Sequence, residues 1–152
     1  MLPHINLYIV NYTYICHKSI NREISRIRID VFVEECGFCL QEEFDDNEKD
    51  FLHCCLYENN IFVAYARIKV NLKTARIGRV LVLKDRRNKG LGRQILLYAE
   101  KEIFKRNIYL AEVHALDQAV GFYEKLGYVK DGDWFIEDGR NHIRMIKRLE
   151  VI

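Results

Sequence analysis

The sequence predicts an α/β fold in which helices pack on the faces of a mixed, mainly antiparallel β-sheet. Short runs rich in β-branched and aromatic residues recur through the chain, as is typical of strands. Between them lie segments whose apolar residues are three and four positions apart, as is typical of amphipathic helices. The 152 residues contain one proline and no linker-like stretch, so residues 1–152 are predicted to form a single domain.

The first part of the chain is predicted to form a strand, a helix and an acidic loop. Leu7–Ile15 is rich in Ile, Val, Tyr and Thr, which favours a strand. Ser19 can cap a helix whose apolar face begins at Ile20 and extends to about Glu35. The acidic run Glu42–Asp46 follows and is predicted to be a loop.

The remaining elements continue as strands and two helices. Strands are predicted at His53–Tyr57, Ile61–Val70, Ala75–Leu83, Ile108–Val113, Trp134–Glu137 and Ile143–Leu149. One helix is predicted from Leu91 through Ile103, and another from the cap Asp117 through Lys125. The order gives about seven strands, and the two that flank the first of these helices should run parallel through a crossover.

Composition and charge exclude several classes of protein. The net charge of +2 is too small to indicate nucleic-acid binding. No apolar run approaches the ~20 residues that span a bilayer, and the N-terminus lacks the pattern of a secretory signal, so we expect a cytoplasmic protein without a membrane partner. Five cysteines without such a signal indicate reduced thiols. Cys36 and Cys39 have metal-ligand spacing, but no second pair completes a set, and no metal is predicted.

A basic, glycine-containing loop carries the clearest functional signal. It lies between the apolar strand that ends at Leu83 and the helix that begins at Leu91, and it contains Gly90 and Gly92. Unpaired backbone N–H groups at the start of a helix can cradle an anion, and glycine allows a phosphate to come close. The basic residues around these glycines are Lys84, Arg86, Arg87, Lys89 and Arg93, against Asp85 alone. A polyphosphate ligand is therefore expected.

Two familiar phosphate-binding motifs do not fit this loop. A P-loop needs Lys-Ser/Thr after its second glycine, and Arg93-Gln94 stand there. The dinucleotide motif needs a third glycine where the chain has Ile95, and it follows the first strand of a βαβ unit rather than the fourth strand.

The spacing Arg87-x-x-Gly90-x-Gly92 after an apolar strand resembles the pyrophosphate loop of the GNAT superfamily of N-acetyltransferases. Phe122–Tyr128 resembles the family's second landmark, a helix whose tyrosine faces the coenzyme sulfur. The chain is similar in particular to the ElaA-like subfamily from about Arg28 to Met145. The matching residues are Arg28-x-x-Val31-Phe32-Val33-x-Glu35, Asp45-Asp46, His53, Ala64-Tyr65-Ala66-Arg67, Ile77-Gly78-Arg79-Val80, Glu137-Asp138-Gly139 and His142-Ile143-x-Met145. Two positions depart from the subfamily. Cys36 stands where the subfamily usually has Gln, and Leu116 stands where it usually has Gln or Asn.

The resemblance implies a GNAT-like fold and an enzyme that transfers the acetyl group of acetyl-CoA to a primary amine. The amine attacks the thioester directly in a ternary complex, without a metal. Tyr123 would protonate the departing thiolate. The residues expected to hold the coenzyme are Val80, Leu81 and Val82 through strand amides, Arg87, Asn88, Lys89, Gly90, Leu91, Gly92 and Arg93 through loop amides, and Tyr123.

Several groups are candidates for the general base that accepts the amine proton. Glu112 and His142 are the first choices, and Glu35 and His114 the alternatives. Glu112 and His114 alternate along a strand and should point to one face. Arg67 and Arg79 are expected in buried ion pairs, in which Glu35 is a candidate partner, and binding of an acidic group of the substrate is the alternative.

The sequence limits the acceptor only to a small-molecule or peptide amine. Asp45 and Asp46 could attract a cation, but solvated acidic loops are common. The same fold leaves two alternatives. The donor could be a longer acyl-CoA, or the protein could be a non-catalytic sensor that binds coenzyme A. Family members often pair through edge strands, so a homodimer is possible.

Overall fold

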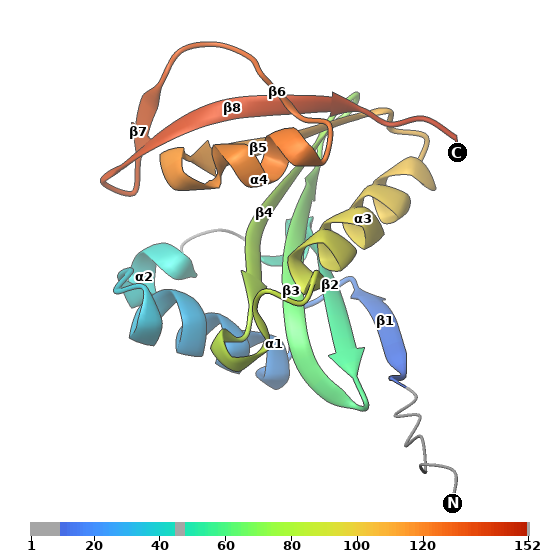
Figure 1. Ribbon diagram of the computed structural model, residues 1–152, viewed down its shortest axis with the longest axis vertical. Coiled ribbons are helices and arrows are strands. Elements are labelled where there is room, and N and C mark those ends of the chain that lie inside the picture. Colours follow the sequence, from blue (N-terminus) through green and yellow to red (C-terminus); the bar gives the residue numbers. More distant parts are fainter. Residues whose placement is uncertain (1–9, 45–47, 152) are drawn as a thin grey trace, which may run out of the picture.

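In the computed structural model, which describes residues 10–44 and 48–151, eight strands form one mixed sheet (Figure 1). The strands are β1 (Tyr12–His17), β2 (Phe51–Glu58), β3 (Ile61–Val70), β4 (Ala75–Val82), β5 (Leu110–Leu116), β6 (Val129–Lys130), β7 (Phe135–Glu137) and β8 (Arg140–Arg148). They lie in the order β1-β2-β3-β4-β5-β8-β6, and β7 also pairs with β8. Only β4 and β5 are parallel among the described pairs. The predicted sheet type and the parallel crossover are confirmed.

Within residues 10–44 and 48–151, four α-helices and several short turns connect the strands. The α-helices are α1 (Arg22–Arg28), α2 (Leu40–Glu43), α3 (Leu91–Phe104) and α4 (Val120–Lys125). A π-helix, η1 (Ile29–Glu35), continues directly from α1, and the 3-10 turns are η2 (Glu48–Asp50), η3 (Lys84–Arg86) and η4 (Asp117–Ala119). No helix in the described ranges is long and apolar enough to cross a membrane.

The first helix differs from the prediction in its cap and in its second half. Asn21, not Ser19, caps α1, because its Oδ1 accepts a hydrogen bond from the N–H of Ile24 at 2.9 Å. From Ile29 onward the backbone widens to π geometry, and the N–H of Cys36 reaches the carbonyl of Val31 at 2.9 Å. Such widened turns are frequent at functional sites, and this one precedes a wall of the cleft described below.

Other predicted elements also differ from the structure, among them β5 and β8, whose bounds were misplaced by up to three residues. The first strand runs from Tyr12 to His17 rather than from Leu7 to Ile15, of which residues 7–9 lie outside the described residues. Glu42 and Glu43 end the short helix α2 instead of lying in a loop, while Asp45 and Asp46 are outside the described residues. The two-residue strand β6 was not predicted, because so short a segment has no period to detect.

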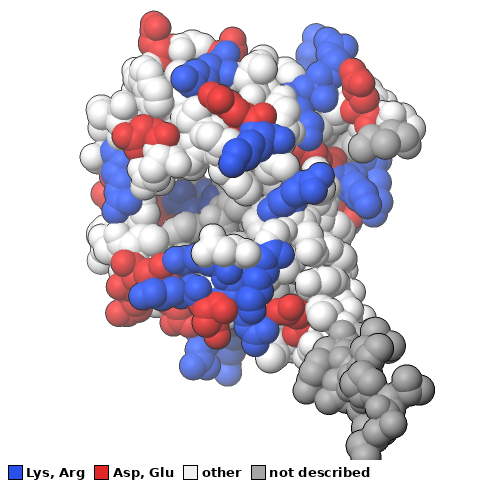
Figure 2. All heavy atoms as spheres, viewed as in Figure 1, with Lys and Arg blue, Asp and Glu red and all other residues white. Residues whose placement is uncertain are grey.

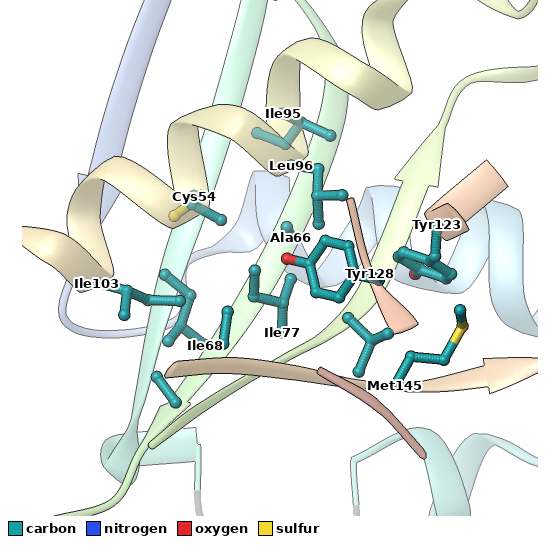
Figure 3. Close-up of a cluster of buried hydrophobic side chains, with 14 of the residues drawn as sticks. Cys54, Ala66, Ile68, Ile77, Ile95, Leu96, Ile103, Tyr123, Tyr128 and Met145 are labelled. Atoms are coloured by element: carbon teal, nitrogen blue, oxygen red, sulfur yellow. The ribbon is translucent and has the colours of Figure 1, made fainter. Parts of the chain in front are cut away.

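The sheet separates two apolar clusters, since successive side chains of a strand point to opposite faces. On one face, Cys54 and Ala66 pack with Ile95, Leu96 and other residues of α3 in the larger cluster (Figure 3). On the other face, Cys55 and Tyr65 pack with the buried side chains of α1 and η1, namely Ile24, Ile27 and Val31. Figure 1 shows α3 lying across β2, β3 and β4, with α1 and α2 away from it.

Candidate active site

The gap in which the site lies is produced by β4 and β5. These strands pair only where Ala75–Ile77 meets Ala111–Val113. Beyond that point β4 continues to Val82 and β5 to Leu116 without pairing with each other. The edge of β4 that faces β5 therefore has no strand partner in its second half and can bind an extended ligand, although the carbonyl oxygen of Val82 accepts a hydrogen bond from Nε of Arg87 at 3.0 Å.

A β-bulge in β4 accompanies this divergence. Along β3, Tyr65 and Arg67 are two residues apart, but their partners Leu81 and Gly78 are three residues apart. Arg79 lies in the extra position with a φ of +52°, in the left-handed region. The bulge changes which side chains face which layer: Ile77 and Val80 both pack toward the α3 cluster, while Leu81 packs toward α1. A bulge bends its strand and increases local twist, which accounts for the parting of β4 from β5.

A cleft of 340 Å³ opens at the gap and extends toward α2 and β7. Figure 2 shows the surface hollowed between the part of the molecule that carries β7 and β8 and the part that carries α1 and α2. One wall comes from η1, the following loop and α2, the other from the turn between β7 and β8. The lining residues are Phe32, Phe38, Glu42, Glu43, Arg67, Arg76, Ile77, Gly78, Arg79, Val80, His114, Leu116, Ala119, Tyr123, Glu137, Asp138 and His142.

Tyr123 reaches the cleft from α4, at the border of the larger apolar cluster. Its side chain is only 8% exposed and lies edge-on to Tyr128, with ring centroids 5.6 Å apart (Figure 3). Burial raises the pKa of Tyr123 from 10.0 to about 12, because a phenolate would lose its hydration there. The phenol is therefore protonated at neutral pH and can donate a hydrogen bond into the cleft.

His142 lines the same cleft from β8 and is 9% exposed. Its Nδ1 lies 2.9 Å from the carbonyl oxygen of Arg140. Because a carbonyl only accepts hydrogen bonds, Nδ1 carries a proton, and in the neutral ring Nε2 has a free lone pair. No described residue forms a hydrogen bond with Nε2, so this atom is available to a ligand in the cleft.

His114, on β5, is held by an acid that sequence reasoning did not single out. Its Nδ1 lies 3.2 Å from Oε2 of Glu137, and this contact lowers the pKa of the Glu137 carboxyl. Nη1 of Arg76 lies 3.4 Å from Nε2 of the same ring. Both ring nitrogens of His114 thus have protein neighbours, in contrast to His142.

Glu112 points to the same sheet face as His114, as the alternation indicated, but it is not among the residues that line the cleft. Its Oε2 accepts a hydrogen bond from Nε of Arg144 at 2.7 Å. The carboxylate is therefore neutralised beside the cleft rather than directed into it. Of the candidate bases, the structure brings His114 and His142 into the cleft.

Arg67 and Arg79 form ion pairs, as expected, but neither pairs with Glu35. Arg67 pairs with Glu48 at 3.1 Å, and Nε of Arg79 lies 2.9 Å from Oε2 of Glu43. Glu35, the expected partner, instead binds Arg87 through both guanidinium Nη atoms. This pair lowers the pKa of the Glu35 carboxyl. Glu35 and Arg87 are 52 residues apart in the sequence and meet only in the folded chain. Neither sequence segment by itself therefore predicts this pair.

The glycine loop has the backbone of an anion cradle at the start of α3. Asn88 and Gly90 adopt left-handed φ values of +62° and +78°, and no side chain caps the amino end of the helix. Folding neutralises part of the local charge, because Arg86 pairs with Glu58 at 2.8 Å and Arg87 pairs with Glu35. Among the described residues, the basic side chains of this loop that form no ion pair with a carboxylate are Lys84, Lys89 and Arg93, all exposed.

Comparison with known proteins shows the family and the fold of this chain. Residues 20–149 match the family described as acetyltransferase (GNAT) domain. A Bacillus subtilis protein that carries the provisional name of an acetyltransferase is 37% identical over 125 residues, which cover 80% of this chain and 85% of that protein.

Solved structures have the same fold. Escherichia coli ElaA superposes with a TM-score of 0.78 at 24% identity, covering 91% of this chain and 99% of ElaA. An aminoglycoside 6'-N-acetyltransferase complexed with coenzyme A gives a TM-score of 0.74 at 15% identity, covering 92% of this chain and 98% of that one. The expected GNAT-like fold is confirmed.

Proposed function

The chain belongs to the GNAT family of acetyltransferases, and on this premise we propose that it transfers the acetyl group of acetyl-CoA to a primary amine by direct attack in a ternary complex. The observation that carries the proposal is the gap between β4 and β5, where the second half of β4 has no strand partner and the protonated phenol of Tyr123 lines the same cleft. Both suit thioester chemistry, since the first can bind an extended chain and the second can protonate a leaving group.

Acetyl-CoA would supply the acetyl group as a thioester. The backbone of Val80–Val82 is suited to its extended arm, because this part of β4 has no strand partner on the β5 side. The N–H groups from Arg87 to Arg93 are suited to its pyrophosphate, because Gly90 starts α3 without a capping side chain. Lys84, Lys89 and Arg93 add positive charge around this loop.

Tyr123 is proposed to protonate the sulfur as it departs. A phenol with a pKa of about 12 is a weaker acid than an ordinary thiol, whose pKa is about 8.5. The same burial that raises the pKa of the phenol would raise that of a thiol beside it, so the difference between them narrows in the cleft. The neutral phenol also donates a hydrogen bond before the proton moves.

His142 is the group that we propose as general base. Its Nε2 has a free lone pair in the neutral ring and its Nδ1–H is fixed on the carbonyl of Arg140. In the reaction the amine nitrogen forms a bond with the acetyl carbon while the carbon–sulfur bond breaks. One proton passes from the amine to Nε2 of His142, and one passes from the Tyr123 hydroxyl to the sulfur.

The experiment is acetyl transfer from acetyl-CoA to a panel of primary amines, followed by mass spectrometry of the product and by release of free thiol. We expect amine-dependent release and an acetylated product. In His142→Ala, the rise of rate on the basic side of the pH–rate profile should be lost, whereas Glu112→Ala should keep it. Tight acetyl-CoA binding without product for any amine would contradict the proposal and favour a non-catalytic sensor.

A further inference from the structure

The two walls of the cleft touch each other through Arg140. This residue begins β8, immediately after the turn that contributes Asp138 to the cleft. Its Nη2 donates a hydrogen bond to the carbonyl oxygen of Cys36 at 2.9 Å, and its Cζ lies 4.2 Å from the ring centroid of Phe38. Cys36 and Phe38 belong to the opposite wall, 104 and 102 positions earlier in the sequence. We call these contacts the Arg140 bridge.

The bridge is built from groups that hold each other in place. Phe38 is itself braced by Phe32, with ring centroids 6.4 Å apart in an edge-on arrangement, and both rings line the cleft. A guanidinium over an aromatic ring is attracted to the ring face, and its hydrogen bond to a carbonyl is charge-assisted. The Arg140 bridge therefore joins the walls by two contacts of one guanidinium, one with a backbone carbonyl and one with an aromatic ring.

The position of the bridge decides which ligands can enter. The gap between β4 and β5, with Tyr123, takes the coenzyme end of the reaction in the proposed function, so the acceptor approaches from the side of η1, α2 and the β7–β8 turn. Figure 2 shows atoms that join the upper and lower parts of the molecule at the outer side of the hollow, basic side chains among them. The cleft of 340 Å³ is near the lower end of the range for small-molecule sites.

We propose that the Arg140 bridge restricts the acceptor to small primary amines and excludes polypeptides, whose chain would need an open path of about 3.3 Å per residue beyond the reacting nitrogen. This inference rests on the proposed function, because it assumes that the coenzyme occupies the gap beside Tyr123. Arg140 is a specificity-determining residue in this account. Its side chain takes no part in proton transfer, and the carbonyl that orients His142 belongs to its backbone.

The test uses two conjugates in which coenzyme A is joined through a sulfur–acetyl linker to an amine. One carries glycinamide and the other carries a glycine-initiated pentapeptide amide, so the linked nitrogen is the same and only the size beyond it differs. Dissociation constants are measured for the wild type, Arg140→Ala and Phe38→Ala. Arg148→Ala is the matched control, because Arg148 lies on the same strand at its other, exposed end. Thermal unfolding identifies any variant that fails to fold.

In the wild type we expect the glycinamide conjugate to bind at least about tenfold more tightly than the pentapeptide conjugate. Arg140→Ala and Phe38→Ala should each shrink this ratio several-fold, and Arg148→Ala should leave it unchanged. Equal affinities in the wild type, or a ratio that both bridge variants retain, would overturn the size limit while leaving the proposed function intact. Failure of coenzyme A and both conjugates to bind would instead refute the proposed function, and with it the inference.

Discussion

Removal of Arg28 should cost more stability than removal of any surface cation, because this guanidinium is completely buried. Arg28 is 0% exposed, its Nε lies 2.7 Å from Oε1 of Glu43, and its Nη1 lies 2.9 Å from Oε1 of Glu48. Its Nη2 donates to the carbonyl of Glu43 at 2.7 Å, and its Cζ lies 4.5 Å from the centroid of Phe44. The cluster anchors α2, which walls the cleft.

Arg28→Ala removes the cation nearest to the buried carboxylate of Glu43 and leaves only Arg79, whose Nε lies 2.9 Å from Oε2, so the expected cost is at most about 3–5 kcal/mol. For a domain of this size that corresponds to a fall in melting temperature of roughly 6–20 °C. Denaturant unfolding of Arg28→Ala, Glu43→Ala and the double variant measures the coupling, which should be about 1–3 kcal/mol.

Lys105→Ala provides the control for this cycle. Lys105 also contacts a carboxylate, that of Glu102 at 2.8 Å, but its side chain is 68% exposed. An exposed pair of this kind contributes at most about 1 kcal/mol. The reasoning is refuted if Arg28→Ala costs no more than Lys105→Ala, or if the two single changes at Arg28 and Glu43 add within about 0.5 kcal/mol.

Three further changes have defined outcomes. Burial lowers the pKa of His53 below its ordinary 6.5, so as the pH falls the unfolded chain takes up this proton before the folded chain does. The free energy of unfolding should therefore fall as the pH drops from 6.5 toward the lowered pKa. In denaturant unfolding, His53→Gln should flatten this pH dependence. Glu35→Ala frees the guanidinium of Arg87 and makes the loop more positive, so calorimetry should show acetyl-CoA affinity raised about two- to fivefold, as suits an exposed pair. Gly90→Ala places a side chain at a φ of +78° and should cost about 1–2 kcal/mol by denaturant unfolding, whereas Gly121→Ala, in α4, should cost nothing. The His53 prediction is contradicted if wild type and His53→Gln have the same pH dependence of unfolding. The Glu35 prediction is contradicted if acetyl-CoA affinity is unchanged in Glu35→Ala, and the Gly90 prediction if Gly90→Ala and Gly121→Ala have equal effects on stability.

The sequence predicted those features that depend on local pattern. Strands β3 and β4 and the helix after Gly90 were located within a residue, because their periodicity and the glycine turn are local properties. The parallel crossover followed from the handedness and order of these elements.

Features set by contacts between distant segments could not be predicted. Nothing in the residue type marks Arg79 as left-handed, since that φ is imposed by the bulge against β3. The partners of His114 and Arg87 were missed for the same reason: Glu137 and Glu35 approach them only after folding. Strand alternation placed Glu112 among the candidate bases, but it could not indicate that Arg144, on β8, donates a hydrogen bond to the Glu112 carboxylate.

The central claim is that the Tyr123 hydroxyl completes the departure of the thiolate, and Tyr123→Phe tests it most directly. Tyr128→Phe is the matched control, because Tyr128 is buried in the same cluster but its hydroxyl donates to Glu100 at 2.8 Å instead of facing the cleft. Single-turnover transfer to an amine acceptor is measured at saturating acetyl-CoA. The account predicts a loss of about 10²–10⁴-fold in Tyr123→Phe with acetyl-CoA affinity retained, and a small change in Tyr128→Phe. An unchanged single-turnover rate in Tyr123→Phe would contradict it.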